Sequence, residues 1–278
     1  MANIHARAIV SPQAHLGQDV MIGPFCIVDA DVVLGDGCRL ESNVVIQSGV
    51  LLGENNHICE GAVIGGLAQH TNRPVRAGTV RIGSNNSIRE FVTIHRALEE
   101  GQATTIGDDN LLMISAHVAH DCSIGNGVIV TNNVMLAGHV SVGDQAYLAG
   151  AVGVHQFCRI GRLAMVGGQA RIKKDVPPFV VIDDATSFVV GLNLVGLRRA
   201  DFTKEQIARL KAAYRLIYRS GLPWQQMLAR LKTEFTEHPT AEFSTFFSGG
   251  SRGFTPERRR PATLKLHSDT AQLRAKAS

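Results

Sequence analysis

The sequence predicts a mainly β protein, in which a parallel β-helix of triangular cross-section is followed by a small α-helical domain. Aliphatic residues recur at every sixth position as far as Ile172, whereas the following part of the 278-residue chain has helical apolar spacing. Aromatic residues make up only 5% of the chain, so aliphatic side chains must fill the core. That composition suits a repeat of narrow layers.

The six-residue repeat starts at Ile4. Every sixth residue from there to Ile172 is Ile, Leu or Val, except His70, Arg76 and Glu100. A period of six fits neither a helix nor an alternating strand. Each unit is therefore expected to be a short strand and a corner, and three units close one coil of 18 residues. The residue after the aliphatic is often Gly, for which we expect a positive φ at the corner.

Two polar segments, residues 66–81 and 96–105, interrupt the repeat. We expect both to protrude as loops from a β-helix domain that spans residues 1–176. Loops on rigid scaffolds often carry function, although a tolerated insertion is the alternative.

A helical domain is expected over residues 177–248. Thr203 has the position of an N-cap, Gly221 ends that first helix, and Pro223 opens a second one. A third short helix is expected over residues 241–247. Residues 249–278 have no periodicity and an excess of Lys and Arg, which predicts a flexible basic tail. A docking tail for an acidic partner or a membrane surface is the alternative.

The composition also excludes some classes of function. A net charge of +4 is too small to indicate nucleic-acid binding. The sequence contains neither an apolar run long enough to span a membrane nor a signal peptide, so a cytoplasmic protein is expected. No cofactor or metal is expected either. Four of the five cysteines occupy the small position two residues before the aliphatic, which predicts small core hydrophobes: Cys26, Cys38, Cys122 and Cys158.

Histidines gather where residues 18 apart should stack on adjacent coils. This register places His120, Gly138 and Gln156 in one column, and Asp121 and His139 in the next. His117 and His155 lie at the same edge of the prism. At the spacing of parallel strands these side chains fall within about 10 Å of one another.

The chemistry predicted for this cluster is proton transfer. A neutral His120 can take a proton from an attacking hydroxyl, and Asp121 can fix its tautomer. Backbone N–H groups near Gly138 can stabilise an oxyanion. No Ser or Cys in the cluster is placed as a nucleophile, so direct acyl transfer is favoured over a covalent intermediate. A flat prism face makes a poor pocket, so packing around a threefold axis, as a homotrimer, is expected.

Several motifs resemble the UDP-N-acetylglucosamine acyltransferase family, whose members open lipid A biosynthesis. They are IREFVTIHR at 88–96, AHVAHDC at 116–122, LAGHVS at 136–141, VHQFC at 154–158, DVPP at 175–178 and YRSG at 218–221. The resemblance covers residues 1 to about 250. It implies a left-handed β-helix, a helical C-terminal domain and a trimer. It further implies transfer of a 3-hydroxyacyl chain from acyl carrier protein to the glucosamine 3-hydroxyl of UDP-N-acetylglucosamine.

The resemblance also implies residue roles. His120 would be the general base, Asp121 its partner and Gly138 the oxyanion donor. A small residue at Gly168 implies room for longer acyl chains. Arg198 and Arg199 could attract an acidic carrier protein. The residues implied to line the acceptor site are His117, His139, His155, Gln156, His70, Asn72, Asn193 and Arg199.

This chain departs from the family pattern at four acceptor positions. His70 and Asn72 stand where the family commonly has Asp and Lys, and Val195 and Ala200 where it has Glu and Arg. These changes favour, as an alternative, the same chemistry on another acceptor. Less favoured alternatives are an acetyl-CoA-dependent acetyltransferase, a zinc enzyme of the carbonic-anhydrase type and a non-catalytic scaffold.

Overall fold

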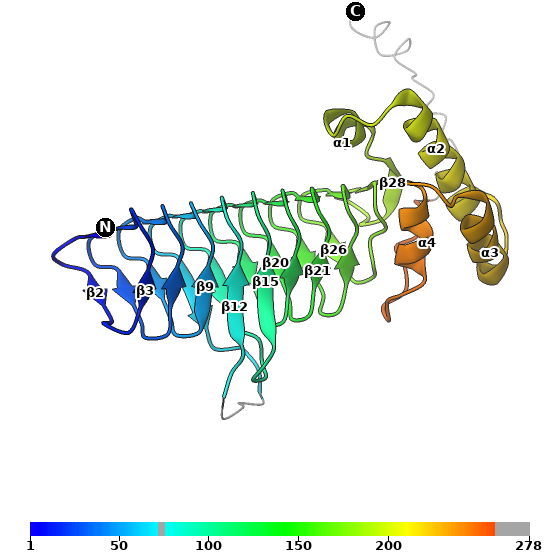
Figure 1. Ribbon diagram of the computed structural model, residues 1–278. Coiled ribbons are helices and arrows are strands. Elements are labelled where there is room, and N and C mark those ends of the chain that lie inside the picture. Colours follow the sequence, from blue (N-terminus) through cyan, green and yellow to red (C-terminus); the bar gives the residue numbers. More distant parts are fainter. Residues whose placement is uncertain (72–75, 259–278) are drawn as a thin grey trace, which may run out of the picture.

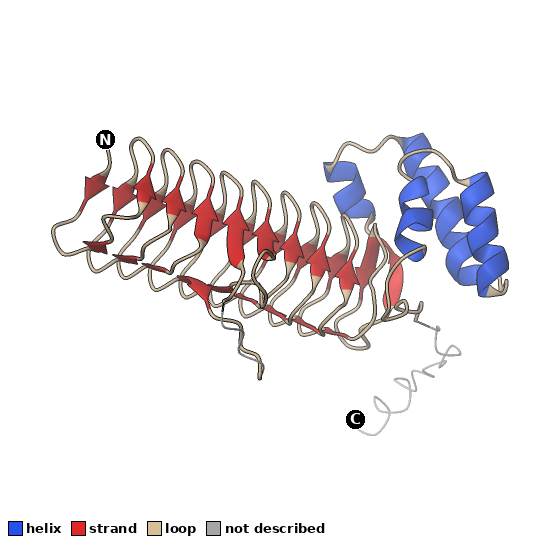
Figure 2. Ribbon diagram, turned by 60° about the horizontal axis from the view of Figure 1, so that its bottom comes forward, coloured by secondary structure: helices blue, strands red, loops and turns tan. Residues whose placement is uncertain are grey.

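The computed structural model describes residues 1–71 and 76–258. The chain winds into a long prism whose coils stack from the N-terminus onwards, and the helices sit at its C-terminal end (Figures 1 and 2). This confirms the predicted fold class, a left-handed parallel β-helix followed by a small α-helical domain.

Three sheets form the faces of the prism, and successive strands along the chain belong to the first, second and third sheet in turn. The first sheet contains β1 (Asn3–Ile4), β4 (Met21–Ile22), β7 (Arg39–Leu40), β10 (His57–Ile58), β13 (Ser87–Ile88), β16 (Leu111–Leu112), β19 (Ile129–Val130), β22 (Tyr147–Leu148), β25 (Met165–Val166), β27 (Val180–Ile182) and β28 (Val189–Leu192). The second contains β2 (Ile9–Val10), β5 (Ile27–Val28), β8 (Val45–Ile46), β11 (Val63–Gly66), β14 (Thr93–His95), β17 (His117–Val118), β20 (Met135–Leu136), β23 (Gly153–Val154) and β26 (Arg171–Ile172). The third contains β3 (His15–Leu16), β6 (Val33–Leu34), β9 (Val50–Leu52), β12 (Thr79–Ile82), β15 (Ala103–Ile106), β18 (Ser123–Ile124), β21 (Ser141–Val142) and β24 (Arg159–Ile160).

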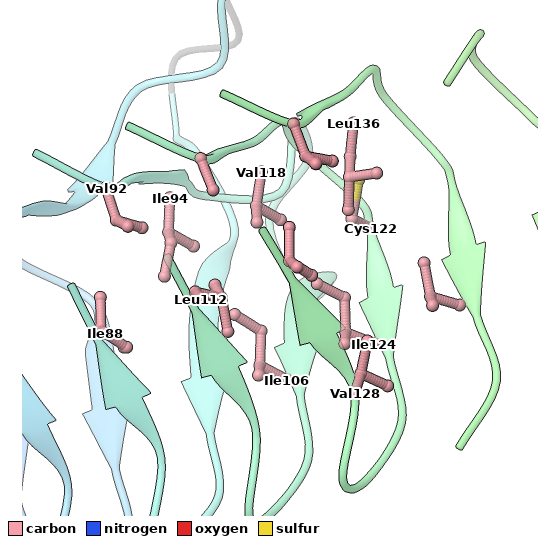
Figure 3. Packing of buried hydrophobic residues seen from close by; sticks show 14 of the residues in the cluster. Ile88, Val92, Ile94, Ile106, Leu112, Val118, Cys122, Ile124, Val128 and Leu136 are labelled. Atoms are coloured by element: carbon pink, nitrogen blue, oxygen red, sulfur yellow. The ribbon is translucent and has the colours of Figure 1, made fainter. Parts of the chain in front are cut away.

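The second residue of each short strand is the repeating aliphatic, and it points into the prism. Figure 3 shows these side chains from neighbouring coils packed against one another, among them Ile94, Val118 and Leu136. The predicted small position contributes too, since Cys122 and the three other cysteines named above are buried. Each buried aliphatic side chain contributes roughly 1.5–3 kcal/mol to folding. The stacked coils are thus stabilised by the burial of apolar side chains as well as by the hydrogen bonds between strands.

The glycines that follow the aliphatic residues do not adopt the predicted positive φ, with the exception of Gly65. The positive φ lies two residues further along each corner, for example at Asp19 and Asn43. The glycines are needed for another reason: a Cβ on Gly35 would lie 2.5 Å from the backbone of Gly53 in the next coil. Coils approach each other so closely here that a side chain has no room.

Both predicted loops leave the prism at one edge, between the second and third sheets. The first connects β11 with β12 and the second connects β14 with β15. They project together from one side (Figures 1 and 2). Their bounds are narrower than predicted, because β11 runs to Gly66, β12 starts at Thr79 and β15 starts at Ala103.

The prism extends further than residue 176. Val176 pairs with Ile160, only 16 residues away, and β27 then pairs in parallel with β25, Ile182 opposite Val166. This coil is two residues shorter than the regular coil of 18. Its aliphatic residues therefore no longer fall at every sixth position counted from Ile4, and the six-residue pattern does not predict this last coil. The predicted boundary at 176/177 therefore lies inside the final coil.

The helical domain contains α1 (Leu194–Arg199), α2 (Lys204–Arg219), α3 (Trp224–Glu234) and α4 (Ala241–Phe247). Thr203 caps α2 as predicted, in a reciprocal capping box with Gln206. The sequence reading gave no separate helix for α1, which is short and capped by Asn193. Phe179 and Phe243 are fully buried in the apolar core of this domain.

The segment after α4 is not a free tail from residue 249, as the sequence suggested. Residues 249–258, called the strap below, return to the prism: Phe254 bridges to Asp175 and Glu257 to Val189. The rest of the predicted tail, 259–278, lies outside the described residues. In the part of the chain that the structure describes, no helix is long and apolar enough to cross a membrane.

Candidate active site

The histidine cluster lies at the same edge as the two loops. The strand register pairs His117 with Met135 and Met135 with Gly153, so residues 18 apart stack as predicted. His120, Gly138 and Gln156 consequently share one column, and all three line a cleft of about 610 Å³. His70 and Gln69 from the first loop border the cleft beside His120.

His120 and Asp121 form the centre of the site. The Nδ1 atom of His120 lies 2.7 Å from Oδ2 of Asp121, and His120 is only 7% exposed. The same carboxylate oxygen accepts a bond from the Leu98 amide at 3.2 Å, and the Asp121 amide donates to Thr104 Oγ1 at 2.8 Å. These contacts fix the carboxylate and hold the imidazole with Nε2 towards the cleft.

His139 completes this group. Its Nε2 atom lies 3.7 Å from Oδ2 of Asp121, and its ring meets that of His120 edge-on at 5.2 Å. Phe157 stacks on the His139 ring, with the ring centroids 4.6 Å apart. His70 meets the His120 ring edge-on as well, with centroids 5.6 Å apart. The first loop therefore adds a fourth titratable side chain, His70, to the cluster of His120, Asp121 and His139.

Gly138 touches the His120 ring. A Cβ built on Gly138 would lie 2.6 Å from Cε1 and 2.7 Å from Nε2 of His120. Its amide nitrogen donates to no acceptor in residues 1–71 and 76–258. At the equivalent corner position of another edge, the amide of Asn126 donates to Asp144 on the next coil. The Gly138 N–H is therefore available to donate a hydrogen bond to an oxyanion that lies between Gly138 and Gln156.

We expect Gly138→Ala to lower the rate of the catalysed reaction by about 100-fold. The new methyl group must displace the His120 ring from its bond to Asp121, and small misplacements of reacting groups carry such penalties. Steady-state kcat measures the effect. Gly191→Ala is the matched control, because Gly191 lies in β28 away from the cleft and its Cβ would meet nothing within 4 Å. Equal kcat values for the two variants would contradict this account of Gly138.

His117 and His95 lie deeper at the same edge. The Nδ1 atom of His117 is 2.8 Å from Thr93 Oγ1, and its ring meets His95 edge-on at 5.1 Å. Burial lowers the pKa of His95 to about 4, with repulsion from His117 and His120 adding to the shift. Burial also lowers the pKa of His117. Both imidazoles are thus held neutral in the folded protein.

These shifts predict a loss of stability in acid. The unfolded chain protonates His95 near its ordinary pKa of 6.5, whereas the folded chain keeps it neutral until about pH 4. Stability conferred by neutral His95 is therefore present above pH 6.5 and lost as the pH falls to 4. Thermal melts between pH 8 and 4.5 should give a shallower decline of Tm for His95→Asn than for the wild type. An unchanged slope would contradict the prediction; the exposed His15→Asn serves as the control.

The strap reaches the far end of the cleft through Arg252, which the sequence reading did not single out. Arg252 Nη2 lies 3.2 Å from Nδ1 of His155. Because a guanidinium only donates, Nδ1 must accept and the His155 proton is placed on Nε2. The contact of the same Nδ1 with the Gln156 carbonyl, also 3.2 Å, is then not a hydrogen bond.

Three predicted site residues lie elsewhere on the chain. Gly168 sits at the corner between the first and second sheets, where a Cβ would lie 3.4 Å from the Gly150 carbonyl oxygen. Asn193 and Arg199 border a separate hollow on the first sheet, beside Tyr147. Asn193 also caps α1 and donates to the Leu163 carbonyl at 2.9 Å. Asn72 lies outside the described residues.

The sequence missed several groups at the site. Thr104, Gln69, Arg171, Lys173 and Arg252 carry no signal of their own in the repeat pattern. His95 stands in a motif quoted above but was given no role. Within the described residues, two groups of side chains bring potential metal ligands within 4.8 Å of one another: His120, Asp121 and His139, and also Cys59, Glu60 and Glu90. The absence of a metal requirement stays a prediction.

Comparisons with known proteins now bear on this site. The model for domain 2 of the UDP-N-acetylglucosamine O-acyltransferases matches residues 175–255, and the model for bacterial transferase hexapeptide repeats matches 13–48, 31–66 and 103–138. An acyl-[acyl-carrier-protein]–UDP-N-acetylglucosamine O-acyltransferase of Anaeromyxobacter dehalogenans is 45% identical over 254 residues, which is 91% of this chain and 99% of that one. The chain belongs to the UDP-N-acetylglucosamine O-acyltransferase family.

Other relatives agree with this assignment. The enzyme of the same name from Synechocystis is 48% identical over 200 residues, covering 70% of this chain and 72% of its own. The UDP-N-acetylglucosamine acyltransferase structure from Bacteroides fragilis superposes with a TM-score of 0.87 at 39% identity, covering 90% of this chain and 99% of that one. That from Francisella novicida gives 0.88 at 35%, covering 95% and 100%. As a member of the UDP-N-acetylglucosamine O-acyltransferase family, the chain is an enzyme.

Proposed function

We propose that this enzyme transfers a 3-hydroxyacyl chain from acyl carrier protein to the 3-hydroxyl of UDP-N-acetylglucosamine, in lipid A biosynthesis. Its relatives are named for this donor and this acceptor. The observation that carries the mechanism is the His120–Asp121 pair, with 2.7 Å between Nδ1 and Oδ2. In this proposal Asp121 holds a proton on Nδ1, so that Nε2 acts as the base at the cleft that His120 lines.

The proposed reaction is a direct transfer. His120 Nε2 takes the proton of the acceptor hydroxyl as the hydroxyl oxygen bonds to the thioester carbonyl carbon. The negative charge that develops on the carbonyl oxygen is stabilised by the Gly138 N–H. When the intermediate collapses, the carbon–sulfur bond breaks and the His120 proton passes to the leaving thiolate. Asp121 keeps the proton on Nδ1 and stabilises the imidazolium in between.

A homotrimer is part of this proposal. Gly168, Asn193 and Arg199 are implied by family resemblance to contact substrates, but they lie away from the His120 edge of the same chain. Apposition of two prisms would bring the first-sheet hollow of one copy beside the His120 cleft of the next. A threefold ring repeats that contact three times, so that the first-sheet hollow and the His120 cleft of every copy are each paired with a neighbouring copy.

A different acceptor is the second candidate, and His70 favours it. An imidazole stands 5.6 Å from the base, at a position where the resemblance implies an acidic contact to the sugar. The deciding assay supplies a 3-hydroxyacyl carrier protein with UDP-N-acetylglucosamine and follows the acylated product by mass spectrometry. Acylated UDP-N-acetylglucosamine supports the first candidate. Donor consumption only with another nucleotide sugar supports the second.

A further inference from the structure

Cations collect at the end of the cleft opposite the loops. Arg171 and Lys173 line the cleft, and both also border an adjoining hollow with Lys174. All three side chains are exposed, and none forms an ion pair with a carboxylate of the described residues. Two acids of the adjoining segments are engaged with other cations: Asp175 pairs with Arg159, and Asp183 with Arg258. An uncompensated positive group inside a substrate cleft favours an anionic ligand.

The strap fixes this end of the cleft. Arg252 Nη2 donates to the Lys173 carbonyl at 3.5 Å as well as to His155, and Thr255 Oγ1 donates to the Lys174 carbonyl at 3.5 Å. The backbone amide of Arg171 donates to Ser187 Oγ at 2.8 Å. The backbone that carries the cations is therefore held from both sides.

The register gives the backbone separation along the prism between the coil that carries the base and the coil that carries Arg171. His117, Met135, Gly153 and Arg171 are successive partners in the second sheet. Three strand spacings of about 4.8 Å separate His117 from Arg171, or roughly 14 Å. Gly153 lies between His117 and Arg171 in this series, and because it has no side chain it leaves the cleft open along this stretch.

This distance separates two sources of phosphate. In the nucleotide sugar about five bonds join the 3-hydroxyl oxygen to the nearest phosphorus, a reach of roughly 6 Å. In the pantetheine arm of an acyl carrier about 13 bonds join the thioester sulfur to phosphorus, roughly 15 Å when extended. The pantetheine arm matches this backbone separation, whereas the link in the nucleotide sugar is less than half as long.

We propose that Arg171 and Lys173 form a subsite for the phosphate of the donor's pantetheine arm. This inference rests on the proposed function, since it assumes a carrier-bound thioester as donor. The arm would lie along the cleft over Gly138 and Gly153, with its thioester at His120 and its phosphate at the two cations. The phosphate would then set the register of the thioester against the base.

The test compares two small donors, a 3-hydroxyacyl phosphopantetheine and the same thioester of pantetheine without phosphate. For the wild type, kcat/KM should be about ten-fold higher with the phosphorylated donor, the worth of one charge-assisted hydrogen bond. In Arg171→Ala/Lys173→Ala that ratio should fall to about one. Arg81→Ala/Lys211→Ala removes two exposed cations elsewhere and is the matched control. Thermal melts confirm that each variant is folded.

Equilibrium binding of free phosphopantetheine and pantetheine, without any transfer, keeps the test independent of the acceptor. Tighter binding of the phosphorylated arm that is lost in the double variant supports the subsite, even if UDP-N-acetylglucosamine proves not to be the acceptor. Equal binding of both arms by the wild type would overturn it. Weaker UDP binding in the double variant, with the donor ratio unchanged, would overturn it too and assign the cations to the nucleotide.

Discussion

His120→Ala is expected to lower kcat by about 10²- to 10⁴-fold, with a much smaller change in donor binding. The methyl group cannot accept the hydroxyl proton, and a general base typically contributes a factor of this size. Asp121 would also lose the partner that its Oδ2 meets at 2.7 Å. Single-turnover transfer, measured with saturating donor and acceptor, isolates the chemical step from binding.

The matched control for this prediction is His57→Ala. His57 is an exposed histidine of the same prism, on the outer face of the first sheet, where it meets Glu41 at 2.8 Å. Its removal should leave kcat within two-fold. A His120→Ala enzyme that is folded by circular dichroism and keeps most of its kcat would show that another group takes the proton. His139 and His70, which meet the His120 ring edge-on, would then be the next residues to replace.

The repeat made most of the prism predictable. An aliphatic side chain at every sixth position dictates both which residues point inwards and which residues stack. For that reason the sequence alone predicts the column of His120, Gly138 and Gln156. The reading of the corner glycines was wrong, because a pattern of Gly shows where a side chain is forbidden without showing why. Here the close approach of the next coil leaves no room for a side chain, and the positive φ is found at other corner residues such as Asn43.

Contacts between residues far apart in the chain had no such periodic signal. The strap joins Arg252 to His155 across 97 positions, and no pattern in the polar residues 249–258 announces it. The final coil was missed because a two-residue deletion shifted the phase on which the count depended. Gly168, Asn193 and Arg199 were named from resemblance, and nothing in a single-chain register could place them relative to His120.

Asp175→Ala is expected to lower the free energy of unfolding of the helical domain by about 3–5 kcal/mol. Asp175 is fully buried, and its Oδ2 lies 2.7 Å from Nε of Arg159. Removing Asp175 leaves the Arg159 guanidinium, whose side chain is only 24% exposed, without its counter-charge. Arg159 also donates to the carbonyls of Phe246 and Gly249, so the pair is where α4 and the strap attach to the prism.

Trp224, the one tryptophan of the chain, lets this loss be located. It stacks on Phe254 of the strap at 5.0 Å, so its fluorescence reports whether strap and helices are docked, whereas far-ultraviolet circular dichroism also reports the β-helix. In urea, the fluorescence transition of Asp175→Ala should move to lower concentration and separate from the dichroism transition. Glu54→Ala, which removes an exposed carboxylate of the prism at a residue without positive φ, should move neither.

Asp175→Asn sharpens the argument, because it keeps the shape and one acceptor oxygen while removing the charge. Its amide oxygen can still accept from the Arg159 backbone amide, which donates to Oδ1 at 2.9 Å in the native chain. An intermediate shift of the fluorescence transition would assign part of the stability to charge and part to hydrogen bonding. If Asn behaves like Asp, the attachment does not depend on charge. If both variants unfold in one transition with the β-helix, the strap and prism form a single cooperative unit and the attachment is not a separable joint.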